Sequence, residues 1–256
     1  MSAGMSGGDA SEAERVRENR VALVTGAGQR VGRVIALSLA RRGFRVAVHY
    51  NSSRAGAERT VEEIQAAGGE ATPFHADLRR PDAPDTLVTA VRAHFGALDV
   101  LVSSAAGMER TSLGNTSPAQ FDAIIALNLR APFLLAQAAS REMPAGGVIV
   151  NIADHMADEP WPDYAVHGIS KAGVVAMTRH LAAALAPKVR VSAVAPGFVL
   201  APEGYGAVAQ ARFAAETPLQ RLGTPEDVAL AVSYLIDATY VTGETIFVDG
   251  GRRVRP

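Results

Sequence analysis

Short, continuously apolar runs alternate with longer amphipathic stretches along most of this chain of 256 residues. Runs without a regular polar position are typical of parallel strands that are covered on both faces. They predict strands over residues 21–25, 45–49, 71–75, 98–103, 147–152, 189–194 and 245–248. The longer stretches predict helices over residues 31–42, 54–67, 83–95, 117–142, 165–186 and 225–237. Strand–helix alternation sustained this far predicts an α/β fold with a doubly wound, parallel, seven-stranded sheet.

The alternating pattern contains no linker and no internal repeat, so we expect a single domain over residues 19–256. Residues 1–18 are small and polar and lack the apolar segment of a signal peptide, which favours a disordered extension. A stretch rich in glycine, proline and alanine, residues 196–218, follows the sixth predicted strand. Loops this long are usually functional, so we expect a substrate lid near residues 197–217.

Composition narrows the classes of function. A hydrophobic content of 48% allows an ample core, and a net charge of −1 gives no reason to expect nucleic acid or an anionic membrane as partner. The absence of cysteine excludes disulfides, thiolate nucleophiles and cysteine-based metal sites. No cluster of other metal-ligating residues has suitable spacing, and no apolar run is long enough to span a bilayer. We therefore expect a cytoplasmic protein without a metal, acting on a small molecule.

A glycine-rich turn, Thr25-Gly-Ala-Gly-Gln-Arg-Val-Gly32, connects the first predicted strand to the first helix. Glycine lets the backbone turn tightly and approach a pyrophosphate, while the helix N-terminus supplies N–H donors. A glycine loop alone is weak evidence, and a plain strand-to-helix turn is the alternative. Its place after the first strand of an alternating chain favours a dinucleotide-binding Rossmann fold.

The second predicted strand ends in His49-Tyr-Asn-Ser-Ser-Arg54, without a carboxylate. An NAD-binding unit usually has an acidic residue here to bind the ribose hydroxyls. Without it, nothing repels a 2′-phosphate, and the guanidinium of Arg30 is able to bind phosphate. The sequence therefore favours NADP(H). The alternative is that Asn51 and the serines only cap the next helix.

The glycine turn resembles the Thr-Gly-x-x-x-Gly-x-Gly motif of short-chain dehydrogenases/reductases, with Arg30 in place of the middle glycine. This variant, together with His49-Tyr50, resembles the pteridine reductase branch, and the resemblance covers nearly the whole chain after residue 20. It implies that Asp77 binds the adenine amino group; the alternative is that Asp77 only caps the helix after Pro81. The cofactor residues expected from the turn and the resemblance are Gly26, Gln29, Arg30, Val31, His49, Tyr50, Asn51, Ser52, Asp77, Leu78, Ser104, Ala105, Lys171, Pro196 and Gly197.

The segment Tyr164-Ala-Val-His-Gly-Ile-Ser-Lys171 resembles the Tyr-x-x-x-Lys helix that carries the catalysis of this family. His167 stands where the family has its tyrosine. The resemblance implies that Lys171 binds the nicotinamide ribose, that Asn128 keeps a water relay, and that Asp154 is the acid of the pteridine reductase branch. We therefore expect His167, Lys171, Asp154 and Asn128 to form the catalytic group. His167 is a catalytic histidine, a non-catalytic part of the pocket wall, or the mark of a degenerate site.

The expected substrate residues are Met108, Met156, Trp161, Phe198 and Tyr205. Met108 takes the place where the pteridine reductases have an aromatic residue, and it offers no flat π face. The resemblance also implies a homotetramer or homodimer that uses the helices at 117–142 and 165–186. The tail from Gly251 to Pro256 is interpreted as a surface segment or a subunit contact.

Together these features predict an NADP(H)-dependent oxidoreductase that reduces a carbonyl or imine of a small molecule, cyclic or open-chain, through a His/Asp/Lys site. One alternative is the same fold used for non-redox catalysis, such as dehydration, isomerisation or cyclisation, with His167 as the base. Another is a catalytically silent protein that only binds the cofactor.

Overall fold

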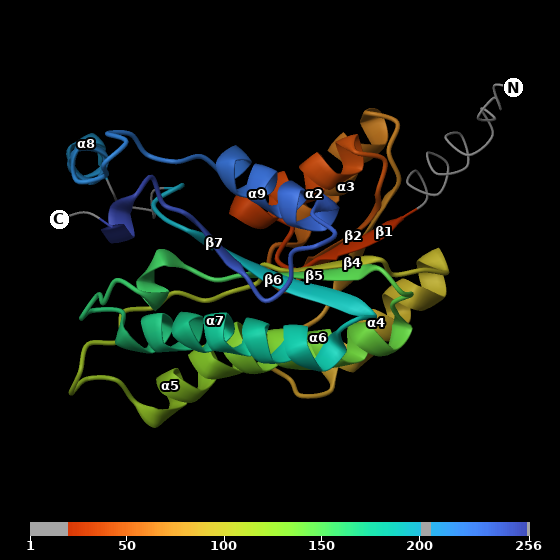
Figure 1. Cartoon of the computed structure of the whole chain (residues 1–256), viewed down its shortest axis with the longest axis horizontal. Helices are drawn as coiled ribbons and strands as arrows, with labels where there is room; N and C mark the ends of the chain where they lie inside the picture. The colour runs from red at the N-terminus through yellow and green to blue at the C-terminus, as the bar shows by residue number, and fades with distance from the viewer. Residues whose placement is uncertain (1–19, 201–205, 255–256) are drawn as a thin grey trace, which may run out of the picture.

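Seven parallel strands form one sheet in the order β3-β2-β1-β4-β5-β6-β7 in the computed structural model, which describes residues 20–200 and 206–254 (Figure 1). The strands are β1 (Val21–Val24), β2 (Arg45–Tyr50), β3 (Ala71–His75), β4 (Val100–Ser103), β5 (Gly147–Ile152), β6 (Val189–Pro196) and β7 (Thr245–Val248). The predicted α/β fold with a doubly wound, seven-stranded parallel sheet is confirmed. The expected extension at residues 1–18 lies outside the described residues.

Helices cover both faces of the sheet (Figure 1). One layer consists of α2 (Arg30–Arg41), α3 (Arg54–Ala66) and α9 (Pro225–Asp237). The other consists of α4 (Ala83–Phe95), α5 (Pro118–Ile125), α6 (Ala131–Glu142) and α7 (Ala165–Leu185). Capping boxes start two of them, with Ser117 and Gln120 at α5 and Thr224 and Asp227 at α9.

The strands have two buried faces, which explains their continuous apolar runs. In β1, Val21 and Leu23 join the core cluster under α4, α6 and α7, whereas Ala22 and Val24 join the cluster under α2, α3 and α9. All four side chains are fully buried. A polar residue at any of these positions would lose water without gaining a partner, which costs about 1–3 kcal/mol.

Two segments differ from the sequence-based prediction. The helix expected over residues 117–142 consists of α5, a π-helical turn at Ala126–Arg130, and α6. This run is long and apolar enough for a membrane span by composition, but half of it is buried inside the fold, as in a core helix. The expected loop or lid at 196–218 contains the helix α8 (Ala207–Ala215).

The chain turns in opposite directions on the two sides of β1, because β2 pairs with one edge of β1 and β4 with the other. The carboxyl ends of such strands open a crevice at the switch point, where ligands bind in open α/β sheets. The loops after β1, β4, β5 and β6 meet at this edge of the sheet.

Candidate active site

A cavity of about 380 Å³ lies at the carboxyl ends of the strands, which is enough for a small ligand. Of the expected cofactor residues, those that line it are Gly26, Gln29, Arg30, Val31, His49, Tyr50, Asn51, Ser52, Leu78, Ser104, Ala105, Lys171, Pro196 and Gly197. Of the other expected residues, Asp154, His167, Met108, Met156, Trp161 and Phe198 line it as well. Residues that also line it but were not expected include Leu127, Ile152, Ala153, His155 and Val199.

The turn after β1 leaves no room for side chains. Gly26 has a φ of +67°, and a Cβ there would lie 3.0 Å from Ala105 Cα. A Cβ on Gly32 would lie 2.4 Å from the carbonyl oxygen of Gly26. The Oγ1 atom of Thr25 accepts hydrogen bonds from the backbone N–H groups of Ser104 and Ala105 at 2.9 and 3.0 Å. The loop after β4 therefore clamps the glycine turn from behind.

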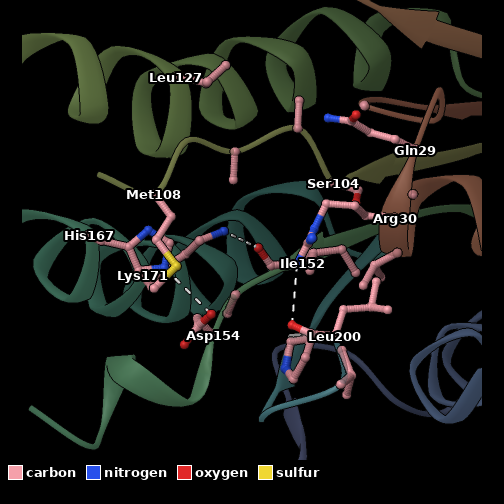
Figure 2. Close-up of a pocket in the computed structure, with 18 of the residues that line it drawn as sticks. Gln29, Arg30, Ser104, Met108, Leu127, Ile152, Asp154, His167, Lys171 and Leu200 are labelled. Atoms are coloured by element: carbon pink, nitrogen blue, oxygen red, sulfur yellow. Dashed lines mark hydrogen bonds and ion pairs between the residues drawn. The ribbon is translucent and has the colours of Figure 1, made fainter. Parts of the chain in front are cut away.

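Arg30 begins α2 with a φ of +52°, in the left-handed region that favours glycine. A side chain in that conformation costs about 1–3 kcal/mol and persists where it serves a site. Its guanidinium points across the cavity and donates to the carbonyl oxygen of Leu200 at 3.3 Å (Figure 2). The conformation gives a physical reason why a glycine is the usual residue here and why an arginine indicates a functional requirement.

His49 fixes the glycine turn to the end of β2. Its Nδ1 accepts the backbone N–H of Gly26 at 3.1 Å, and its Nε2 lies 3.1 Å from the carbonyl oxygen of Ala76. Burial lowers the pKa of His49 to about 4, so the ring is neutral at pH 7 and keeps an acceptor nitrogen. No carboxylate lies among the residues from Tyr50 to Ser53 that line this end of the cavity.

Asp77 does not line the cavity. Its two carboxylate oxygens accept from Arg79 Nε and Nη2, each at 2.9 Å, and this pairing holds the pKa of the carboxyl below its usual range. It does not cap the next helix either, because Asp82 stands at the N-cap of α4. Its expected contact with adenine stays a prediction.

The carboxylate of Asp154 lies between two imidazoles at the other end of the cavity. Its Oδ1 is 3.0 Å from His155 Nδ1, and its Oδ2 is 3.6 Å from His167 Nε2 (Figure 2). Burial favours the protonated carboxyl, but the contact with His155 and the nearby ring of His167 outweigh it and hold the pKa of Asp154 well below its usual range. Asp154 is therefore an anion that faces a nitrogen of each imidazole.

Lys171 is buried one helical turn after His167 on α7. Its Nζ donates to the carbonyl oxygen of Ile152 at 2.7 Å (Figure 2). Burial lowers the pKa of Lys171 to about 8, against the opposing attraction of Asp154. The ammonium is thus a proton donor held ready beside the cavity.

His167 has its two ring nitrogens in different surroundings. The Nδ1 atom lies 3.1 Å from the carbonyl oxygen of Gly107 and 3.4 Å from Asn128 Nδ2. Because a carbonyl oxygen only accepts, this geometry assigns a proton to Nδ1. The Nε2 atom is buried without a hydrogen bond and faces Asp154. It is the nitrogen that is free to exchange a proton with a ligand.

Asn128 sits in the π-helical turn and does not line the cavity. Its Oδ1 accepts from Gly107 N at 2.8 Å, and its Nδ2 donates to Gly107 O at 2.9 Å and to Ser170 Oγ at 3.1 Å. The amide therefore fixes the peptide group that holds His167. The water relay expected at Asn128 stays a prediction.

Aromatic rings close the substrate end. Trp161 stacks on Phe213 of α8 with ring centroids 5.7 Å apart, and Phe213 stacks on Phe198 at 4.2 Å. Trp161 and Phe198 line the cavity, and Phe213 connects them from outside. The expected substrate residue Tyr205 lies outside the described residues.

Two buried charged residues beside the site escaped the sequence reasoning. Arg252 donates to both carboxylate oxygens of Glu159 at 2.9 and 3.2 Å, and only 4% of its side chain is exposed. The interpretation of the C-terminal tail as a surface segment is wrong at this residue. Glu159 follows His155 by four positions, a spacing that could have indicated contact, but no sequence signal pairs it with Arg252. Among residues 20–200 and 206–254, no group of three or more side chains is placed to hold a metal ion.

The chain is similar to known reductases in sequence. A family model described as enoyl-(acyl carrier protein) reductase matches residues 26–253. An uncharacterized oxidoreductase of Methylorubrum extorquens is 39% identical over 244 residues, which cover 92% of this chain and 98% of that protein. The 3-oxoacyl-(acyl-carrier-protein) reductase FabG of Staphylococcus aureus is 35% identical over 243 residues, which cover 92% of this chain and 99% of that protein.

Two solved structures have the same fold and hold a nicotinamide cofactor. FolM alternative dihydrofolate reductase 1 from Brucella canis, complexed with NADP, superposes with a TM-score of 0.89 at 32% identity, covering 94% of this chain and 97% of that one. A blue fluorescent protein from a metagenomic library, in complex with NADPH, superposes with a TM-score of 0.86 at 32% identity, covering 91% and 97%.

Proposed function

Because this chain belongs to the short-chain dehydrogenase/reductase family, we propose that it is an NADP(H)-dependent oxidoreductase that reduces a carbonyl or imine of a small molecule. The observation that carries the proposal is Arg30, held at a φ of +52° beside a β2 end without carboxylates. A guanidinium there binds a 2′-phosphate, which NADP has and NAD lacks.

The described residues fit this cofactor along its whole length. The glycine turn and the start of α2 offer N–H donors and an open approach for the pyrophosphate. Pro196 and Gly197 line the opposite end, and Lys171 is placed to donate to the nicotinamide ribose. When bound, the cofactor supplies the hydride.

The proton comes from His167, which stands at the position of the family tyrosine. Its Nδ1–H is held by the carbonyl oxygen of Gly107, so Nε2 is the nitrogen that transfers a proton to the substrate oxygen or nitrogen. Asp154, 3.6 Å away, stabilises the ring while it carries both protons. A positioned acid of this kind contributes a factor of about 10² to 10⁴ to the rate.

The wall near His167 favours a flat, mostly apolar substrate. Trp161 and Phe198 supply aromatic surface, and Met108 lies over the His167–Asp154 pair (Figure 2). Asp154, His49 and Tyr50 support membership of the pteridine reductase-like branch, and Met108 in place of an aromatic ring points to a cyclic imine or ketone other than a pterin.

The assembly is a homotetramer, or a homodimer, in the cytoplasm. Apolar side chains are exposed on the outer face of α5 to α7, at Phe121, Phe133 and Ile169, and on α9, at Leu230 and Tyr234. Each of these two apolar surfaces fits a separate contact between copies of the chain, as a tetramer needs. The cysteine-free composition fits a reducing compartment.

Calorimetric titration with NADPH and with NADH tests the cofactor. We expect NADPH to bind at least tenfold more tightly, and Arg30→Ala to remove that preference, since one charge-assisted hydrogen bond contributes about 1.5–3 kcal/mol. Arg41→Ala, at the exposed far end of α2, is the matched control and should bind like the wild type. Binding of neither nucleotide contradicts the proposal.

A substrate panel then tests the reaction. Dihydrofolate represents the reaction named for the Brucella neighbour, and acetoacetyl coenzyme A represents the 3-oxoacyl thioesters named for the Staphylococcus relative. We expect NADPH oxidation with a cyclic imine or ketone. Binding of NADPH without any reduction, and with conversion of a probe in the absence of NADPH, would instead favour the non-redox use of His167.

A further inference from the structure

Four ionisable side chains form a line that leads away from His167 into the interior. From His167 the line runs to Asp154 at 3.6 Å, then to His155 at 3.0 Å, measured between the facing nitrogen and oxygen atoms. His155 Nε2 is 3.7 Å from Glu159 Oε2, and Arg252 grips Glu159 at 2.9 Å. Of these residues, the site as proposed uses only His167 and Asp154.

His155 has an oxygen at each ring nitrogen. Its Nδ1 faces Asp154 Oδ1 and, at 3.3 Å, the carbonyl oxygen of Pro196, and its Nε2 faces Glu159. The edge of the ring packs against Trp161, with centroids 5.5 Å apart. The ring therefore lies between two carboxylates, one on the side of each nitrogen.

Arg252 holds Glu159 in this position. Its two hydrogen bonds keep the Glu159 carboxylate facing His155, and a second carboxylate, Glu216 at the end of α8, lies 3.5 Å from Arg252. Around His155 the charged groups are thus Asp154 and Glu159 directly, with Arg252 behind Glu159 and the ammonium of Lys171 acting on Asp154.

We propose that His155 is a proton reservoir that recharges His167 through Asp154 after each reduction. This inference rests on the proposed function and adds a residue to it. Arg252 and Glu159 act through His155 and are positioning residues.

The proton balance of one turnover is simple. The substrate carbon takes the hydride of NADPH, and the substrate oxygen or nitrogen takes the proton of His167 Nε2. A proton then moves from His155 Nδ1 to Asp154 Oδ1, and Asp154, transiently a carboxylic acid, turns its carboxyl and gives that proton to His167 Nε2. His155 keeps its Nε2 proton, and its Nδ1 regains a proton from solvent through the cavity that His155 lines. NADPH is oxidised, the substrate is reduced, and one solvent proton is consumed.

The other polar groups near His167 are held by the backbone instead. Asn128 bonds the backbone nitrogen and the carbonyl oxygen of Gly107, and Lys171 donates to the carbonyl oxygen of Ile152. Ser170 Oγ donates to the carbonyl oxygen of His167 at 2.6 Å. His155 differs from these groups because it contacts Asp154 on one side and a second carboxylate, Glu159, on the other.

Nuclear magnetic resonance of the histidine-labelled protein, without cofactor or substrate, tests the stored proton. We expect Glu159→Gln to lower the protonation midpoint of His155 by about 1 pH unit, because one of its two carboxylates is removed. Glu216→Gln removes a carboxylate that touches Arg252 but not His155, and should leave the midpoint unchanged. An equal midpoint in Glu159→Gln and wild type overturns the proposal.

Rapid-mixing kinetics with the reducible probe from the panel tests the recharging. In His155→Gln the first turnover should keep the wild-type rate, because His167 already holds its proton, and later turnovers should slow about tenfold. A first turnover slowed as much as the later ones indicates a purely structural role and overturns the proposal. If the midpoint shifts but the wild type neither binds NADPH nor reduces a probe, the oxidoreductase function fails while proton storage is supported.

Discussion

Asn128 bonds both backbone polar groups of Gly107, accepting from its nitrogen at 2.8 Å and donating to its oxygen at 2.9 Å. The same carbonyl oxygen faces His167 Nδ1. A π-helical turn, the loop after β4 and the start of α7 are thereby joined at one residue. Irregular helical turns of this kind are frequent at functional sites, because they turn a side chain out of the regular helix register.

Removing this clamp should destabilise the protein. We expect Asn128→Ala to lower the free energy of unfolding by about 1–3 kcal/mol, since it leaves the part-buried N–H of Gly107 without its acceptor. Urea unfolding followed by circular dichroism measures the change. Asn115→Ala, at an exposed loop position, is the control and should stay within about 0.5 kcal/mol of wild type. A similar loss in both variants would contradict the assignment.

Arg30→Gly should separate stability from cofactor binding. Glycine removes the strain of the left-handed conformation, so we expect a gain of about 1 kcal/mol in unfolding free energy. NADPH affinity should fall at least tenfold and NADH affinity should not change, because only the 2′-phosphate loses a partner. Thermal unfolding and calorimetry on the same preparation give both numbers, and a stabilised variant with undiminished NADPH affinity would disprove the phosphate role.

Lys171 gives a pH dependence with a defined sign. Its pKa falls from the usual 10.5 to about 8 on burial, so the unfolded chain binds its proton more tightly than the folded one between these values. The contribution of Lys171 to stability therefore rises as pH increases from 8 to 10.5, and is constant below 8. Relative to wild type, Lys171→Met should lose about 3 kcal/mol of advantage across this interval. Urea titrations at both ends of it measure the difference, and parallel curves would refute the shift.

His167→Phe should remove the proton donor and leave the cofactor site in place. We expect kcat to fall by a factor of about 10² to 10⁴ and the Kd for NADPH to stay within about twofold. Turnover with the reducible probe and calorimetry check the two parts. If kcat is unchanged, His167 only lines the pocket. If His167→Tyr raises kcat, the site is a degenerate form of the family's own.

Trp161 is the only tryptophan in the chain and reports on α8 directly. We expect Phe213→Ala to shift its fluorescence to longer wavelength, because the ring loses the stacked neighbour 5.7 Å away and meets water. Phe133→Ala, on the partly exposed outer face of α6, is the matched control and should leave the spectrum unchanged. An unshifted spectrum in Phe213→Ala would mean that α8 does not cover Trp161 in solution.

The sequence predicted the elements whose signal is local. Strands such as Gly147–Ile152 were predicted to the residue, since both faces of the run are buried and Asn151 is its one polar residue. The cofactor-binding end of the cavity could also be predicted from the sequence, because the glycine spacing and the missing carboxylate each involve only a few consecutive residues.

Other features depend on contacts between distant segments and left no local pattern. The π-helical turn adds a residue to a helix without breaking its apolar periodicity, so Asn128 was expected at the cavity and lies behind it. Arg252 reads as a surface residue until Glu159, 93 positions earlier, is placed against it. His155 was not predicted as a site residue, and its contact with Pro196, 41 positions later, has no local signal.

The clamp between Thr25 and the backbone of Ser104 and Ala105 bears on how the protein is made. The glycine motif is complete in a nascent chain once the first βαβ unit has been synthesised. Its backing is supplied only when β4 has joined the far side of β1, because Ala105 then fills the space behind Gly26. A fragment that ends before β4 would carry the recognisable motif without a rigid cradle. Nucleotide affinity is therefore acquired only after β4 has been synthesised and paired with β1, and the motif is not a portable module for grafting onto another scaffold.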